Sequence, residues 1–187
     1  MTRRFSVWYM SKKRRFAFIG IAAAVFSAVY SAGAASTMSE EEAKNLKDVF
    51  GKQVEGIDAI GIFLNNFRIA ATMFIPALGI FVGMFSAYST GLVFKALAQT
   101  SPQIANLPPL IILATPFGIM ELLSYSIAMS QSAILVNAMM RKHSLRPMLV
   151  PTMIQLGIVA ALLFAGAFVE FYMIKAFTPE ISDGTHS

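Results

Sequence analysis

Residues 149–174 read LVPTMIQLGIVAALLFAGAFVEFYMI, a stretch whose only charged residue is Glu170. A helix rises 1.5 Å per residue and the hydrocarbon core of a bilayer is about 30 Å thick, so this stretch is long enough to cross a membrane. Three similar apolar stretches precede it, at about residues 16–35, 69–94 and 110–140. We therefore predict an all-α, polytopic transmembrane helical bundle in the cell membrane.

The composition supports a membrane domain with little besides it. Of the 187 residues, 56% are hydrophobic and only 13% are charged, whereas about a quarter of the residues of a soluble domain are charged. The net charge of +5 comes mainly from the first 15 residues. Since positive charge favours the cytoplasmic side and anionic headgroups, we expect residues 1–15 to be a basic cytoplasmic flank and expect no nucleic-acid partner.

The first transmembrane helix is expected at residues 16–36. A competing interpretation is a cleaved signal peptide, since Ala32, Gly33 and Ala34 fit the small-x-small cleavage pattern, but the apolar run is longer than such peptides usually have. Small residues recur every four positions along this stretch, which favours close approach of another helix. This ridge consists of Gly20, Ala24, Ala28 and Ala32.

Residues 37–67 are expected to hold an extracytoplasmic amphipathic helix. Ser39 followed by Glu42 is typical of a capping box, which satisfies free amides at a helix start. Apolar residues then recur at helical spacing at positions 43, 46, 50, 54 and 57. The simplest placement of this stripe is on the membrane surface or on the spans, and docking of a partner protein is the alternative.

The second stretch begins with polar residues and contains helix-perturbing ones. Asn65, Asn66 and Arg68 are expected at its outer edge, a turn is expected at residues 88–91, and Pro76 is expected to kink the helix. Within the span, the spacing of Gly79 and Gly83 permits backbone contact with a neighbouring helix.

The third stretch, residues 110–140, is too long for one straight span and too short for two. Pro116 and Gly118 divide it, and we expect a half-helix through Leu113, a break at residues 115–118 and a full span from Ile119. Irregular backbone at such depth requires surrounding protein or a water-filled cavity.

The number of membrane crossings depends on the positions of the charged loops as well as on the apolar spans. Four spans from a cytoplasmic N-terminus would place Arg141, Lys142 and Arg146 outside, against the positive-inside rule. An extra passage made by residues 91–98 and 110–114 would return this loop to the cytoplasm. The sequence therefore favours five crossings.

Two carboxylates in apolar stretches are the candidate functional groups. A buried carboxylate in a membrane usually marks a pathway, a proton relay or a structural hydrogen bond. Glu121 shares a helix face with Ser124, Tyr125 and Ser132. A structural hydrogen bond is the simpler interpretation of this residue, and proton or ion handling is the alternative. Glu170, near Tyr172, is expected at the interface.

The sequence favours no catalysis. It contains no cysteine and only two histidines, and it lacks hydrolase, metalloprotease, Walker and dinucleotide motifs. We expect no enzyme activity, no metal and no cofactor.

Several segments together resemble a known family. The first segment is Phe63-Leu64-Asn65-Asn66, at the start of a span that contains Gly79 and Gly83. The second is the segment 88–91, and the third is Pro116-Phe117-Gly118-Ile119-Met120-Glu121, which opens the next helix. This pattern is similar to the stage II sporulation protein M family, in particular its archaeal members, over residues 60–174.

The resemblance implies an integral membrane protein, which in spore-forming bacteria acts as a scaffold with peptidoglycan-remodelling partners; an archaeal member lacks that wall. Glu121 matches the family's Pro-x-Gly-x-x-Glu segment. Many relatives carry a histidine before its glycine, where this chain has Phe117, so a role for that imidazole is not carried over.

The leading hypothesis is a non-enzymatic scaffold or accessory subunit of a larger membrane complex, in contact with the bilayer and with other integral membrane proteins or further copies of itself. The alternative is a small transporter or channel component that uses Glu121 beside the broken helix.

Overall fold

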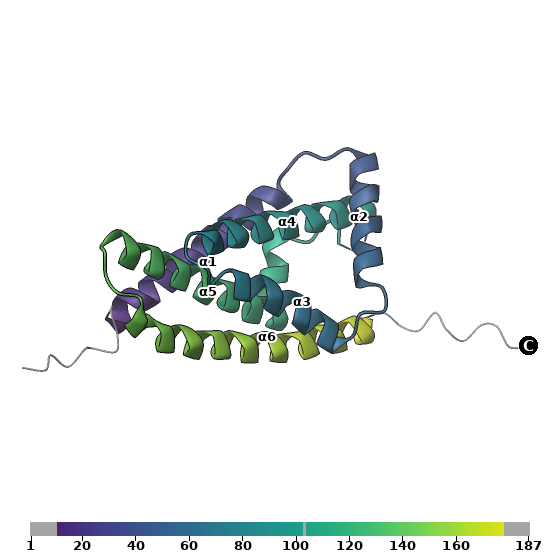
Figure 1. The fold of residues 1–187 in the computed structure, drawn as a ribbon. Coiled ribbons are helices and arrows are strands. Elements are labelled where there is room, and N and C mark those ends of the chain that lie inside the picture. The colour runs from purple at the N-terminus through teal and green to yellow at the C-terminus, as the bar shows by residue number, and fades with distance from the viewer. Residues whose placement is uncertain (1–10, 103, 178–187) are drawn as a thin grey trace, which may run out of the picture.

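The computed structural model describes residues 11–102 and 104–177, which form helices and connecting segments with no strand among them (Figure 1). Four stretches are long and apolar enough to cross a membrane: Lys12–Ala34, Leu78–Thr100, Pro116–Met140 and Arg146–Ala176. The predicted all-α membrane bundle is confirmed. The helices are α1 (Lys12–Ala34), α2 (Glu40–Val54), α3 (Ala59–Thr72), α4 (Leu78–Thr100), α5 (Pro116–Met140) and α6 (Leu149–Phe177), with short 3-10 helices η1 (Pro109–Ala114) and η2 (Arg146–Met148).

Helix α5 is the central helix of the bundle. Of the four long apolar stretches, this one is the most buried: 56% of the residues in its most apolar segment are buried. Helix α5 packs against α1, α4 and α6. Its buried face is rich in hydroxyls that bond within the helix: Ser124 donates to the Met120 carbonyl oxygen (2.7 Å) and Ser130 to that of Ile127 (2.8 Å). These hydroxyls are therefore satisfied by the backbone of α5 itself.

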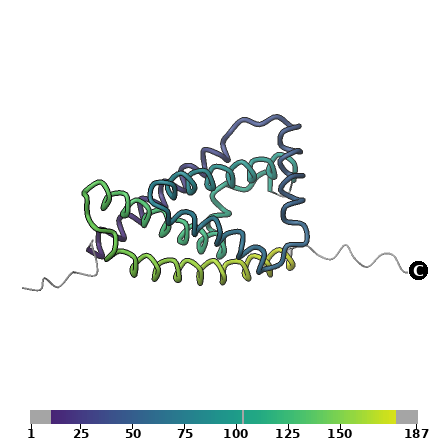
Figure 2. The backbone as a smooth tube through the Cα atoms, viewed as in Figure 1, coloured from purple at the N-terminus to yellow at the C-terminus, as the bar shows by residue number. Residues whose placement is uncertain are grey.

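Helix α2 lies across one end of the bundle rather than along it (Figure 2). The predicted capping box is present, since the Ser39 hydroxyl accepts a bond from the Glu42 amide (3.2 Å) and the Glu42 carboxylate accepts one from the Ser39 amide (2.8 Å). The helix ends at Val54, and Gly56 follows with a φ of +67°. Residues 59–67, predicted as part of this outer helix, belong to α3 instead.

Helices α1 and α4 touch through backbone at two glycines. A Cβ added at Gly33 would overlap the Tyr88 carbonyl oxygen, and one added at Gly91 would overlap that of Tyr30. The segment 88–91, predicted as a turn, lies inside α4. The packing face of α1 is therefore the one that carries Tyr30 and Gly33.

The predicted ridge of small residues lies on another face of α1. Gly20, Ala24 and Ala28 are exposed, and apart from the adjoining turns of α1 itself no described atom comes within 4 Å of a Cβ built at Gly20. Within the described residues, no other helix of this chain packs on the ridge. The ridge is therefore predicted to contact a helix of another chain.

Residues 91–98 and 110–114, predicted to make an extra passage together, do not combine: 91–98 lie inside α4 and 110–114 lie in η1. Instead of a kink at Pro76, the chain reverses over residues 73–77, so that α3 and α4 are separate helices (Figure 1). Proline lacks the amide that would continue the helix, and Ala77 adopts a φ of +65°, which turns the backbone away from the α3 axis. Helix α3 thus runs from the α2 end into the bundle, and α4 returns to that end.

The break before α5 is shorter than predicted. Residues 109–114 form η1, a 3-10 helix in place of the expected half-helix, and α5 begins at Pro116. Thr115 alone separates the two helices: its hydroxyl donates to the Ile112 carbonyl oxygen (2.6 Å) and accepts from the Gly118 amide (3.0 Å). Thr115 therefore satisfies the Gly118 amide at the start of α5 and the Ile112 carbonyl oxygen at the end of η1.

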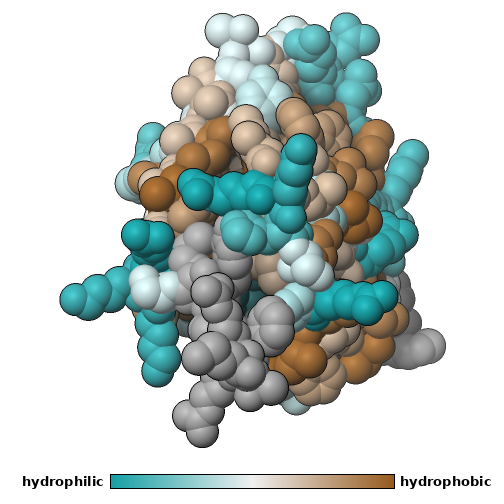
Figure 3. Space-filling model, turned by 60° about the vertical axis from the view of Figure 1, so that its left-hand side comes forward, coloured by the Kyte–Doolittle hydropathy of each residue, from teal (hydrophilic) through white to brown (hydrophobic). Residues whose placement is uncertain are grey.

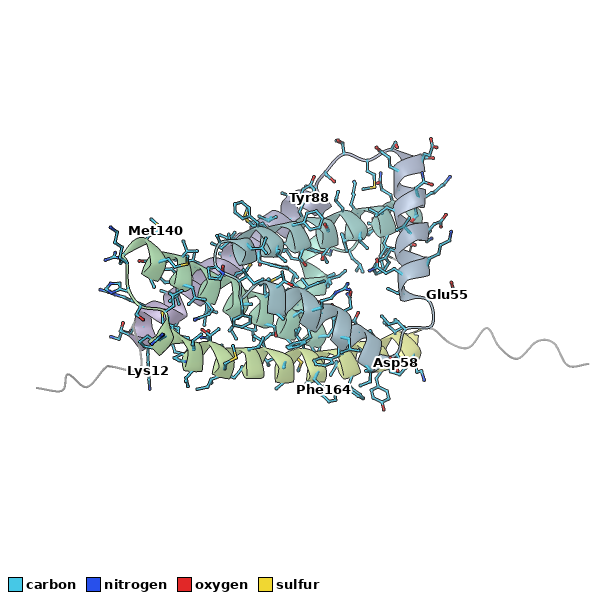
Figure 4. The ribbon with its side chains drawn as sticks, viewed as in Figure 1. Lys12, Glu55, Asp58, Tyr88, Met140 and Phe164 are labelled. Atoms are coloured by element: carbon cyan, nitrogen blue, oxygen red, sulfur yellow. The ribbon has the colours of Figure 1, made fainter. Side chains whose placement is uncertain are left out.

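The two ends of the bundle differ in charge. Figure 4 places Lys12 and Met140 at one end and Glu55 and Asp58 at the other. Since Arg141 and Lys142 follow Met140, the basic residues of α1 and of the α5–α6 loop share an end, where Figure 3 shows projecting hydrophilic side chains. The positive-inside rule predicts that this end is cytoplasmic, and we refer to it as the cytoplasmic end and to the α2 end as the outer end.

Candidate functional site

A cavity of about 630 Å³ lies toward the outer end of the bundle. Helices α3 and α4 form its sides, the first turns of α5 and part of η1 form its inner wall, and the last residues of α2 close it from outside. The apolar stripe of α2 contributes Phe50, Val54 and Ile57 to this closure. The stripe thus rests on the spans, as the simpler of the two sequence interpretations held.

Glu121 lies in the inner wall of the cavity. The second turn of α5 carries it, directly after the Thr115 break, and Asn66 of α3 donates a hydrogen bond from its side-chain amide to Oε1 of Glu121. Asn65 in turn donates to the Asn66 side-chain oxygen at 3.5 Å. Two sequence candidates, Asn66 and Glu121, are therefore brought together from segments 55 residues apart.

Glu170 lines the same cavity from α6 and is half-buried. The sequence placed it at the interface, and no local pattern relates it to Glu121. Two carboxylates thus share one cavity, and none of the residues that line it, all within the described part of the chain, is a lysine, arginine or histidine.

Three of the four glycine candidates lie at close contacts, Gly20 being the exception. A Cβ at Gly79 would overlap the Met73 carbonyl oxygen, one at Gly83 would overlap the Met129 side chain, and one at Gly118 would overlap the Ile112 carbonyl oxygen. Gly79 therefore permits the reversal before α4, Gly83 the α4–α5 contact, and Gly118 the approach of η1 to α5.

Arg68 lies in an open groove on the outward face of α3. The groove is lined by Leu64, Asn65, Phe67, Arg68, Ala71, Thr72 and Ile75. Arg68 is exposed, and no hydrogen bond or ion pair joins its guanidinium to another residue within 11–102 or 104–177. The predicted place of this cation was the outer edge of a span.

The position of Arg68 between the two ends of the bundle can be calculated from the lengths of α3 and α5. It is nine residues beyond Ala59 at the outer start of α3, or about 14 Å at 1.5 Å per residue. Seven residues further, the Ile75 carbonyl oxygen accepts a bond (2.9 Å) from Ser132, which is about 12 Å before the cytoplasmic end of α5. Arg68 therefore lies near the middle of the bundle, deeper than predicted.

A second polar cluster, missed in the sequence, joins α5 to α6. Gln131 donates to the Thr152 hydroxyl (2.8 Å), and Gln155 donates to the Gln131 side-chain oxygen (2.9 Å). All three residues are buried. Glutamines in two apolar stretches were the available signal, but the pairing depends on the register between the helices.

Comparison with known proteins identifies one family. The family model for stage II sporulation protein M matches residues 15–173. Neither the curated proteins nor the solved structures give a match. The match extends from the basic end of α1 to the last turns of α6 and includes every residue of the Asn66–Glu121–Glu170 cavity. The chain therefore belongs to the stage II sporulation protein M family, as a polytopic membrane protein.

Proposed function

We propose that this protein is a non-enzymatic accessory subunit, or scaffold, of a larger membrane complex, and that the groove at Arg68 is where it contacts a partner. The observation that carries the proposal is an exposed guanidinium near mid-depth on an outward face. An arginine at the centre of a membrane helix costs about 2.5–3.5 kcal/mol on insertion scales and such residues almost always face protein or a water-filled cavity. A partner helix over the groove would remove this cost.

The shape and chemistry of the groove support a helical partner. Asn65, Arg68 and Thr72 follow one another at spacings of three and four residues, so they form one polar stripe on α3. Leu64 and Ile75, also in the groove, are 56% and 48% exposed. A transmembrane helix with a carboxylate opposite Arg68 and small or polar residues along its contact face would satisfy both features.

A second surface supports the same role. The exposed ridge of Gly20, Ala24 and Ala28 on α1 offers close backbone approach to a further helix. The stripe of α2, by contrast, packs against α4 and the cavity within the chain, so it is not part of the proposed partner surface.

Photo-crosslinking in native membranes tests the proposal. A benzophenone side chain at Leu64, in the groove, is expected to crosslink a protein, whereas one at Phe81, a 70% exposed position on α4 outside the groove, is expected to react with lipid. In an Arg68→Leu background the Leu64 crosslink should disappear. Equal protein crosslinking from both positions, or none from Leu64, would contradict the proposal.

The cavity favours a second candidate, a transporter or channel component. Glu121 lies where a 3-10 helix and a membrane helix meet inside the bundle, and broken helices of this kind form ion and substrate sites in transporters. Proteoliposomes of the wild type and of Glu121→Gln distinguish the candidates. Proton or cation flux that is lost in Glu121→Gln supports transport, and no flux from the wild type removes this candidate.

A further inference from the structure

The lining of the outer cavity combines aromatic rings with carboxyl groups. Its walls are mostly apolar and carry six aromatic rings: Phe26, Phe50, Phe85, Phe94, Phe117 and Tyr125. Glu121 and Glu170 supply two carboxyl groups, and no lining residue supplies a positive charge. Asn66 is the single side chain with a hydrogen bond to Glu121 among the described residues.

This combination selects the chemistry of an occupant. A carboxylate in an apolar environment is stabilised by a positive partner, and aromatic faces attract organic cations, above all quaternary ammonium groups. Small inorganic cations are less suitable, because Ca²⁺ and Mg²⁺ require six or more oxygen ligands at fixed distances. A volume of about 630 Å³ lies within the usual range of small-molecule sites.

The cavity is accessible near the outer interface. Phe85, Thr90, Gln53 and Val54 line it and are exposed as well, so its mouth lies between α4 and the last turn of α2. An amphiphilic molecule in the outer part of the bilayer can reach this mouth without crossing the charged cytoplasmic end.

We propose that this cavity binds a hydrophobic organic cation, with its positive group beside Glu121 and Glu170 and its apolar body against the aromatic rings. The site shares Asn65 with the Arg68 groove but does not include Arg68, and it requires no partner protein. Binding here is also independent of transport, since a bound molecule need not pass to the cytoplasmic end.

Equilibrium dialysis with a matched pair of ions tests the proposal. The purified full-length chain in a non-ionic detergent is titrated with tetraphenylphosphonium and, separately, with tetraphenylborate, which has nearly the same size and shape but the opposite charge. Saturable binding of one phosphonium per chain is expected, without comparable binding of the borate. Subtraction of detergent-only samples removes partition into micelles.

Three variants locate the binding. Glu121→Gln and Glu170→Gln are each expected to weaken phosphonium binding about tenfold, equivalent to about 1.4 kcal/mol. Glu55→Gln removes an exposed carboxylate at the end of α2, outside the cavity, and should bind as the wild type does. Ser89→Phe fills the cavity from α4 without a change of charge, and it should weaken binding even if the carboxylate variants elute as aggregates.

Several results would overturn the proposal. These are no saturable phosphonium binding by the wild type, equal binding of the two ions, or wild-type affinity in all the cavity variants that elute as single species. Arg68→Leu should retain phosphonium binding, so loss of the partner and loss of the cation site are separate outcomes.

Discussion

Gly33 of α1 and Gly91 of α4 lie against each other's helix backbone: a Cβ on either one would overlap a carbonyl oxygen of the opposite helix. Glycine is the residue type that allows membrane helices to approach this closely. The contact sets the spacing of α1 and α4, and the Tyr30 hydroxyl, which donates to the Pro109 carbonyl oxygen (2.8 Å), fixes η1 to the same place.

Gly33→Ala and Gly91→Ala should each destabilise the bundle by about 1–3 kcal/mol, the usual cost of overpacking, because the obstructing atoms are backbone. Gly20→Ala is the matched control on α1, since apart from the adjoining turns of α1 itself no described atom lies within 4 Å of the added Cβ. Thermal unfolding in detergent measures the effect. Equal melting temperatures for Gly33→Ala and Gly20→Ala would show that the two helices do not pack through Gly33.

The hydrogen bond between Asn66 and Glu121 predicts a non-additive pair of substitutions. Asn66→Leu should cost about 1–3 kcal/mol, because it leaves a carboxyl in the cavity wall without its donor. The double variant Asn66→Leu/Glu121→Leu should recover most of this loss, since both polar partners are then gone. A double variant as unstable as the sum of the single variants would argue against the pairing.

The capping box predicts that α2 loosens in acid. The bonds that Ser39 donates to the Glu42 carboxylate, first from its amide (2.8 Å) and then from its hydroxyl (2.7 Å), lower the pKa of Glu42 from its ordinary value of 4.5. With a lowered folded-state pKa, the stabilisation is present above pH 4.5 and is lost as the pH falls through the lowered value.

Hydrogen exchange of the α2 amides measures this effect. Exchange should accelerate in the wild type as the pH falls below the ordinary pKa of a glutamate, after correction for the intrinsic rate. In Ser39→Ala, where the cap worth on the order of 1 kcal/mol is gone, exchange should be faster throughout and less dependent on pH. Identical profiles for the two proteins would rule out this cap as a stabilising element.

The shared location of the basic residues predicts the orientation of the chain. The sequence has no cysteine, so Lys142→Cys and Asp48→Cys each introduce a single thiol, at exposed positions at opposite ends of the bundle. A membrane-impermeant maleimide added to intact cells should label Asp48→Cys and spare Lys142→Cys until the membrane is opened. Labelling of both thiols in intact cells would exclude this orientation.

Local features of the fold could be predicted from sequence because each has a local cause. Apolar length identified the long spans, and Ser39 with Glu42 identified the start of α2. Pro116 identified a break before the third span, although α5 begins at Pro116 rather than at the predicted Ile119. Glu121 was identified as a candidate because a carboxylate within an apolar stretch is costly wherever it packs.

Long-range features could not be predicted, because they depend on register between segments far apart in the chain. Pro76 is compatible with a kink or with a reversal of the chain. The reversal depends on the positive φ of Ala77, which the sequence does not indicate. The ridge of Gly20 marks a face suited to helix contact but does not say whether the contacting helix belongs to this chain. The proximity of Glu170 to the Glu121 cavity depends on how α6 lies against α3 and α5.

Native mass spectrometry of the complex released from membranes in a mild detergent tests the central claim, that this chain is a subunit held through Arg68. For the wild type, the account predicts a particle heavier than the 20.4 kDa chain, with a second component in fixed stoichiometry. It predicts the loss of that component in Arg68→Leu but not in Lys142→Gln, which removes an exposed cation at the cytoplasmic end. A wild-type protein that appears only as the single chain, or an Arg68→Leu variant that keeps the whole assembly, would contradict the account.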